Sequence, residues 1–139
     1  MKKLQTGSAL RSSLATIAII VALLGIAVIM LPEGYDDDLA KIGQGSNIVV
    51  LIQNKGAQQS MDLLNLLNQV RADYEGKVEF LIADTDTPEG RAFERQRQLD
   101  SSVLVFFAPD GAQLNIIRSN IDEIGLRMAL NNTFTLAPR

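Results

Sequence analysis

The chain has 139 residues and a formal net charge of −3, and it contains neither cysteine nor histidine. These absences exclude zinc sites built on Cys or His ligands, Cys nucleophiles, Ser-His-Asp triads and c-type haem attachment. The lack of tryptophan and an aromatic content of 5% argue against a stacking platform for nucleic-acid bases.

The first predicted element is a transmembrane helix from Leu14 to Leu31. This stretch carries no charge, and as a helix it spans roughly 27 Å, close to the hydrocarbon thickness of a bilayer. A cleaved signal peptide and a buried soluble helix are the alternatives. We favour a retained anchor, because the apolar run is longer than that of a signal peptide and Pro32-Glu33-Gly34 makes a poor cleavage site.

The charges on either side of this stretch predict its orientation. Lys2, Lys3 and Arg11 precede it, and Glu33 and three consecutive aspartates follow it. Under the positive-inside rule, residues 1–13 form a cytoplasmic segment. We therefore expect an inner (cytoplasmic) or photosynthetic membrane, with the C-terminal domain periplasmic or lumenal.

Residues 32–46 are rich in glycine and acid, which predicts an acidic linker with one turn of helix at Asp37–Ile42. Asp36–Asp38 offer carboxylates that suit a hard cation. Three consecutive carboxylates do not converge on one ion without a looped backbone, so a solvated negative collar is preferred and no metal is expected.

Seven elements are predicted in the remaining domain, 47–131, followed by a loose tail, 132–139. Continuous apolar runs and turn residues predict the strands, and helical spacing of apolar residues predicts the helices. Thr87 with Pro88 and the string Asn120–Glu123 are helix-start signals. In order, the elements are strand 47–53, helix 57–74, strand 77–83, helix 88–98, strands 102–107 and 112–118, and helix 121–131. The residues expected to face inward in the first of these helices are Met61, Leu64, Leu67 and Val70, with Leu63 and Leu66 widening the stripe. In the last helix they are Ile124, Met128 and Leu130.

This order predicts the α/β class: a mixed four-stranded sheet with helices on both faces. It also resembles the thioredoxin fold. Three local strings are similar to that family: Tyr74–Val78 at a helix-to-strand junction, Ala83–Asp86 at a strand end, and Val105–Ala112 at a hairpin. The resemblance covers about residues 47–130.

The positions that carry chemistry in the thioredoxin family are altered. Aligned on the junction, the Cys-x-x-Cys motif corresponds to Ala57-Gln58-Gln59-Ser60, and the cis-proline position corresponds to Ser102. The preceding aromatic residue corresponds to Gly56 and the buried acid to Leu51. Thiol–disulfide exchange requires a thiolate and a resolving thiol, so the resemblance implies a redox-inactive domain.

Two surface features are candidate contact sites. The helix N-terminus at 57–60 presents backbone N–H groups that suit an anion or a peptide carboxylate, although Gln58, Gln59 and Ser60 alternatively cap the helix. Arg91 and Arg95 share a helix face as possible partner contacts for an acidic surface, or form a solvated face paired with neighbouring glutamates.

These features favour a non-catalytic, single-pass membrane accessory subunit whose outer domain caps or stabilises an integral-membrane protein complex, with a respiratory or photosynthetic electron-transport complex as the expected host. The anchor helix contacts membrane lipid, and no cofactor, nucleic acid or small-molecule substrate is expected. The alternative is a membrane-tethered peptide-binding or chaperone-like assembly module without redox activity. An enzyme using Asp84 and Asp86 is disfavoured, because no second group converges on them.

Overall fold

The computed structural model describes residues 2–30, 34–118 and 120–136. The chain divides into two compact units, Met1–Gly34 and Tyr35–Arg139.

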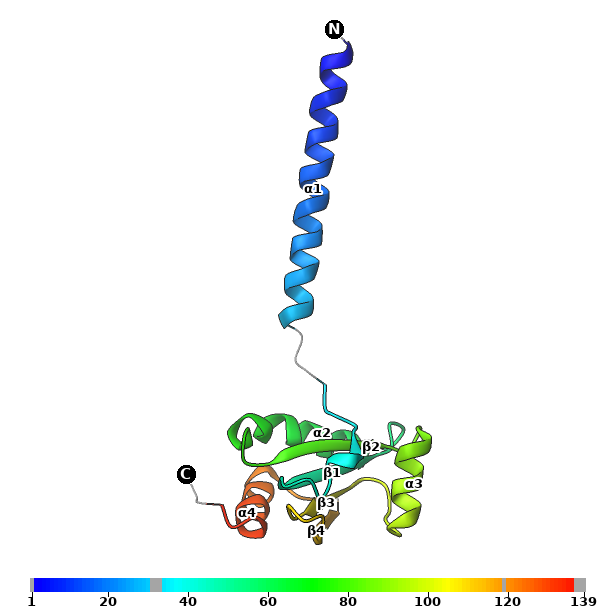
Figure 1. The fold of residues 1–139 in the computed structure, drawn as a ribbon, viewed down its shortest axis with the longest axis vertical. Helices are drawn as coiled ribbons and strands as arrows, with labels where there is room; N and C mark the ends of the chain where they lie inside the picture. Colours follow the sequence, from blue (N-terminus) through cyan, green and yellow to red (C-terminus); the bar gives the residue numbers. More distant parts are fainter. Residues whose placement is uncertain (1, 31–33, 119, 137–139) are drawn as a thin grey trace. The chain divides into compact units, whose positions relative to one another are not determined.

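The first unit contains a single helix, α1 (Lys2–Met30) (Figure 1). Its side chains are described over residues 11–26, and all of them are exposed within the chain. Over the residues that the structure covers, no helix combines the length and the apolar character needed to cross a membrane. The transmembrane segment 14–31 therefore stays a prediction, and its last residue, Leu31, lies outside the described residues.

The second unit is built on a four-stranded mixed sheet with the strand order β2-β1-β3-β4 (Figure 1). Strand β1 is parallel to β2 and antiparallel to β3, and β3 and β4 form an antiparallel hairpin. The bounds are β1 Ile48–Gln53, β2 Glu79–Asp84, β3 Val103–Phe107 and β4 Gln113–Arg118. The two central strands are buried along their whole length, as their continuous apolar sequences predict.

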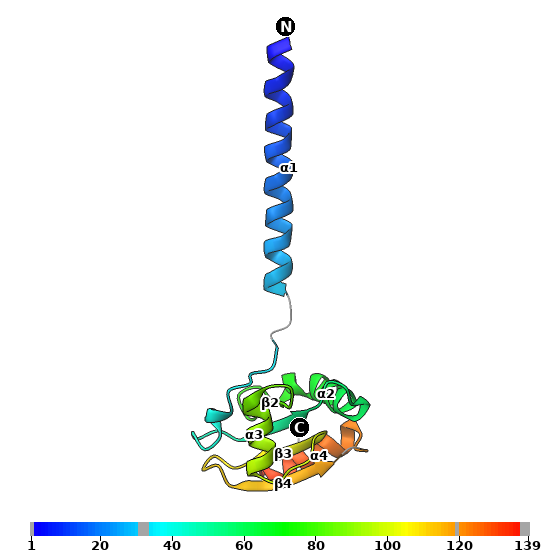
Figure 2. The same ribbon diagram turned by 90° about the vertical axis from the view of Figure 1, so that its right-hand side faces the viewer.

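Helices cover both faces of this sheet, as Figure 2 shows in the second view. One face packs against α2 (Gln58–Val70), its 3-10 extension η2 (Arg71–Tyr74) and α4 (Glu123–Thr133). The other packs against α3 (Pro88–Gln96) and the short 3-10 helix η1 (Leu39–Lys41). The predicted α/β class, with a four-stranded mixed sheet and flanking helices, is confirmed.

Helix α3 begins as its sequence predicts and lies unusually close to β2. The Thr87 hydroxyl accepts a hydrogen bond from the Gly90 N–H at 3.1 Å, and Pro88 occupies the first helical turn. A Cβ atom added to Gly90 would lie 1.9 Å from the Asp84 carbonyl oxygen. Only glycine permits this approach, which fixes α3 against the carboxyl end of β2.

The expected linker is, from Tyr35 onward, part of the folded domain. The Asp36 carbonyl accepts a hydrogen bond from the Ile82 N–H at 2.9 Å, so the segment adds a bridge to the edge of β2. Leu39 and Ile42 pack on the core against that sheet face. The turn of helix expected within Asp37–Ile42 is present as the 3-10 helix η1 (Leu39–Lys41). Residues 35–46 belong to the second unit, because their side chains contact partners far along the chain, and residues 32–33 lie outside the described residues.

The Tyr35 side chain secures this segment. Its hydroxyl donates to the Asn68 side-chain oxygen at 2.7 Å, and the Arg71 guanidinium carbon lies 4.2 Å from the ring centroid. Burial raises the pKa of the Tyr35 hydroxyl despite the nearby Arg71 charge. The segment is thus bound to α2 and η2 as well as to the sheet.

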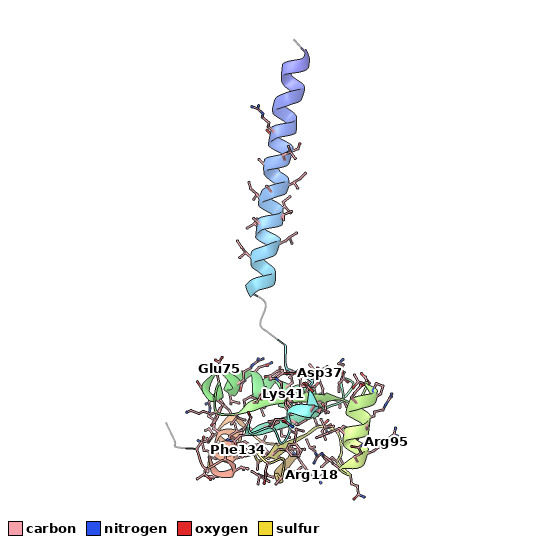
Figure 3. The ribbon with its side chains drawn as sticks, in the orientation of Figure 1. Asp37, Lys41, Glu75, Arg95, Arg118 and Phe134 are labelled. Carbon is pink, nitrogen blue, oxygen red and sulfur yellow. The ribbon has the colours of Figure 1, made fainter. Side chains whose placement is uncertain are left out.

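The acidic segment Asp36–Asp38, expected to be a solvated collar, partly forms interactions within the domain. Lys41 forms ion pairs with Asp36 and Glu79, and the Asp38 carboxylate accepts from the Ala40 N–H at the start of η1. Lys41 and Asp37, labelled in Figure 3, belong to this same segment. The lysine hydrogen bond, followed by that from the Asp38 N–H, lowers the pKa of Asp36.

Two predictions about the C-terminal part are corrected. Helix α4 starts at Glu123 after the cap residue Asp122, and its buried residues are Leu126 and Leu130. Of the three residues expected to face inward, Leu130 is buried, whereas Ile124 and Met128 are 70% and 58% exposed. Ile124 and Met128 are four residues apart, and so are the buried residues Leu126 and Leu130. The spacing alone therefore does not distinguish the two stripes, and the sheet packs against Leu126 and Leu130.

The predicted loose tail is ordered as far as it is described. Phe134 and Leu136 pack on the core, and the Phe134 ring centroid lies 5.6 Å from that of Phe106. Residues 137–139 lie outside the described part of the chain. Met61, on the predicted inner stripe of α2, is 38% exposed, because the buried face of this helix is formed by Ser60, Leu63, Leu67 and Val70.

Candidate functional site

The degenerate motif position and the cis-proline-equivalent position meet in space. Ser60 lies in the first turn of α2 and is fully buried. Its hydroxyl oxygen lies 2.7 Å from that of Ser102, in the loop before β3, and also accepts a hydrogen bond from the Asn54 N–H at 3.0 Å. Two serines thus join the start of α2 to the carboxyl end of β1.

Ser102 is held in a strained backbone conformation, with φ of 61°. Its N–H donates to the Ile52 carbonyl at 2.8 Å, so the residue is fastened to the end of β1 as well as to Ser60. No peptide bond of the described chain is cis. The loop therefore approaches α2 through a serine in the left-handed region.

The first turn of α2 has free donors. The cap residue Ala57 makes no side-chain hydrogen bond to the helix, and within the described chain the backbone N–H groups of Gln58, Gln59 and Ser60 have no hydrogen-bond acceptor. The Gln58 amide instead donates to the Asp62 carboxylate at 2.9 Å. These side chains were expected either to bind an anion or to cap the helix and meet water. They do not cap it, because the Ser60 hydroxyl is used by Asn54 and Ser102, while Gln58 and Gln59 are exposed to solvent.

Gln53, which the sequence analysis did not single out, lies beneath this turn. It is the last residue of β1, and strand alternation places it on the same face as Val49 and Leu51, the face that α2 covers. The residue is 7% exposed, and no buried side-chain nitrogen or oxygen of the described residues lacks a hydrogen-bond partner, so the Gln53 amide meets solvent. Its carbonyl is satisfied by the Thr85 N–H at 3.0 Å.

An ion pair borders this position. The Lys55 ammonium lies 2.7 Å from the Asp84 carboxylate, whose side chain is 16% exposed. The lysine hydrogen bond, and then the Asp86 N–H, lowers the pKa of the Asp84 carboxyl. The same contact raises the pKa of Lys55. The Asp86 N–H thus donates to the Asp84 carboxylate in the turn after β2, and Lys55 forms an ion pair with Asp84.

The second candidate surface, Arg91 and Arg95, lies on the outer side of α3. Both residues are exposed, and neither makes an ion pair with the residues that the structure describes. Figure 3 shows Arg95 on α3, away from the sheet. Among the described residues, the expected pairing of these arginines with Glu89 and Glu94 does not form. Arg97 differs from both, because its guanidinium carbon lies 5.0 and 4.8 Å from the ring centroids of Phe93 and Phe107.

The described residues contain no group of three or more acidic side chains arranged to hold a metal ion. No protein-family model matches the sequence. No curated protein matches it either.

Proposed function

We propose that this chain is a non-catalytic, single-pass membrane accessory subunit, anchored by residues 14–31. The observation that carries the proposal is the exposure of apolar side chains all round α1. Successive residues of a helix are rotated by about 100°, and Ile19, Ile20 and Val21 are each at least 51% exposed. A helix that is apolar on every side requires an apolar surrounding, which a bilayer or the core of a larger membrane assembly supplies.

We propose further that the second unit is a thioredoxin-like domain that has lost redox activity. The strand order β2-β1-β3-β4 and the contact between Ser60 and Ser102 support this assignment, because they bring together the two positions that the resemblance aligns with the redox motif and the cis-proline. The absence of cysteine from the sequence removes both thiols that the exchange reaction needs. Such a domain serves by its shape, capping or stabilising its partner complex.

The proposed partner contacts are α1 within the membrane and the Arg91–Arg95 surface outside it. Two unpaired arginines one helical turn apart suit an acidic surface on the partner. Because exposed ion pairs are weak, this surface contributes orientation, and α1 contributes most of the stability of attachment.

Two experiments test the parts of this proposal. Washing native membranes with alkaline carbonate should leave the protein in the pellet, and release into the supernatant would contradict the anchor. Deletion of the gene should then shift or deplete one membrane complex on a native gel. If every membrane complex is unchanged while the protein cross-links to many different chains, the tethered peptide-binding module becomes the better account.

A further inference from the structure

The two edges of the sheet differ in how the described residues cover them. The β2 edge is covered by the chain itself, because the Asp36 carbonyl accepts from the Ile82 N–H at 2.9 Å. Strand β4 forms the other edge, and among the residues that the structure describes it pairs with a strand only on its β3 side. An open edge presents backbone groups to which a strand of another chain can bind.

The hydrogen-bond pattern identifies Ile116 as a β4 residue whose backbone faces outward. In β1, the Gln53 carbonyl accepts from Thr85, which follows β2, so Gln53 faces β2 and by alternation Val50 faces β3. Val50 is opposite Val105 in β3, and Val105 is in turn opposite Ile116. Because Val105 directs its N–H and C=O toward Val50, the N–H and C=O of Ile116 point away from β3.

The Asn115 side chain binds the outward donor of Ile116. Its Oδ1 atom accepts from the Ile116 N–H at 2.9 Å. Its Nδ2 atom donates to the hydroxyl of Thr133, the last residue of α4, at 3.4 Å, so the helix helps to orient the amide. A strand added at this edge needs the Ile116 N–H as a donor, and it must first break the bond to Asn115.

Other features that protect edge strands are scarce in β4. The strand contains no proline and no lysine, and its one charged residue, Arg118, is its last. Leu114 is 47% exposed, and Ile116 and Ile117 are half-buried. The register shift opposite Phe106–Phe107 disturbs only the first part of the strand and leaves the aliphatic part regular. An aliphatic edge of this kind favours pairing between chains.

We propose that the Asn115 side chain prevents a second copy of this chain from adding its β4 strand to the sheet. Strand β4 can pair with itself in antiparallel orientation about Ile116. In that arrangement the N–H and C=O of Ile116 in each copy bond to the C=O and N–H of Ile116 in the other. The bond from the Ile116 N–H to Asn115 withholds the donor that this pairing requires.

The proposal is independent of the accessory-subunit function and is tested on the purified full chain in detergent. Asn115→Val removes the acceptor and introduces a residue that favours strands. Gln113→Val, the corresponding change at an exposed position of β4, is the matched control. Sedimentation equilibrium in density-matched detergent measures the dimer dissociation constant. We expect it to be about tenfold lower for Asn115→Val than for the parent and for Gln113→Val, because each copy contributes one released donor.

Amide hydrogen exchange locates the contact. In the parent, the Ile116 N–H should be protected at every protein concentration. In Asn115→Val it should exchange freely in dilute protein and become protected as the concentration rises. A dimer in which this N–H stays unprotected forms through another surface and would contradict the proposal.

Two further results would overturn the role of Asn115. Equal dissociation constants for Asn115→Val and Gln113→Val would show that the side-chain acceptor does not control the edge. An unprotected Ile116 N–H in the parent would show that the bond to Asn115 does not form. The measurement on the parent decides the matter if Asn115→Val does not fold.

Discussion

The hydroxyl oxygens of Ser60 and Ser102 lie 2.7 Å apart, although 42 residues separate them in the sequence. The bond crosses from α2 to the loop that leads into β3. It also orients the Ser60 oxygen that accepts from the Asn54 N–H. One buried hydroxyl thus holds three segments together at the end of the sheet where the candidate site lies.

Removing this hydroxyl should destabilise the domain. Ser60→Ala leaves the Asn54 N–H and the Ser102 hydroxyl without their partner, and we expect a loss of about 1–3 kcal/mol in the free energy of unfolding. Thermal unfolding of the purified full chain in detergent, followed by circular dichroism, measures the change. Ser101→Ala, in the same loop, is the control, and an equal effect of the two substitutions would argue against the serine contact.

The approach of α3 to β2 predicts a larger effect at Gly90. Because an added Cβ would lie 1.9 Å from the Asp84 carbonyl oxygen, Gly90→Ala forces the helix away from the strand. We expect a destabilisation of at least about 2 kcal/mol. Gly34→Ala meets nothing within 4 Å and should unfold at the parent temperature. A Gly90→Ala protein as stable as the Gly34→Ala protein would mean that α3 does not lie where the structure places it.

The observed orientation of α4 is tested by shortening one side chain on its buried face and one on its exposed face. Leu126→Ala removes a fully buried side chain and should cost about 2–5 kcal/mol. Met128→Ala, on the outer face, should change the free energy of unfolding by no more than about 0.5 kcal/mol. The reverse order of effects would restore the inward orientation that the sequence suggested.

The Lys55–Asp84 pair predicts a dependence of stability on pH. The pKa of Asp84 is lower in the folded state, so the pair stabilises the fold above the ordinary aspartate pKa of about 4. That contribution is lost as the pH falls through the folded-state pKa. Carboxyl ¹³C titration should show the Asp84 pKa rising in Lys55→Met, whereas an unchanged titration curve would show that the lysine does not contact this carboxylate.

The attachment of the Tyr35 segment should be visible by hydrogen exchange. Tyr35→Ala removes both the Arg71 stacking and the bond to Asn68. The Ile82 N–H, which bonds to the Asp36 carbonyl, should then exchange faster, while the Val50 N–H in the central strand β1 should keep its protection. Equal protection of Ile82 in parent and variant would show that Tyr35 does not hold the segment in place.

The sheet was predictable because its central strands are continuous apolar runs that have one stable location, the buried middle of a sheet. The buried face of α4 was not predictable in the same way. The pair Ile124 and Met128 has the same spacing as the pair Leu126 and Leu130, and only tertiary packing decides which pair is buried. The Tyr35 segment reads as a linker because its partners lie on α2, more than 30 residues away.

The candidate site was predictable in part. The resemblance to the thioredoxin family directed attention to Ser60 and Ser102, and the structure places their hydroxyl oxygens 2.7 Å apart. Gln53 gave no signal, since a polar residue at a strand end is ordinary. What distinguishes it is its 7% exposure, which follows from tertiary packing.

We propose that this chain is a fixed subunit of one membrane complex. Purification of the endogenous protein in mild detergent, followed by a native gel and mass spectrometry, tests this proposal. We predict one dominant complex in which the chain is present in constant stoichiometry and remains bound at high salt. A lone monomer, or a broad set of unrelated co-purifying proteins, would contradict the account.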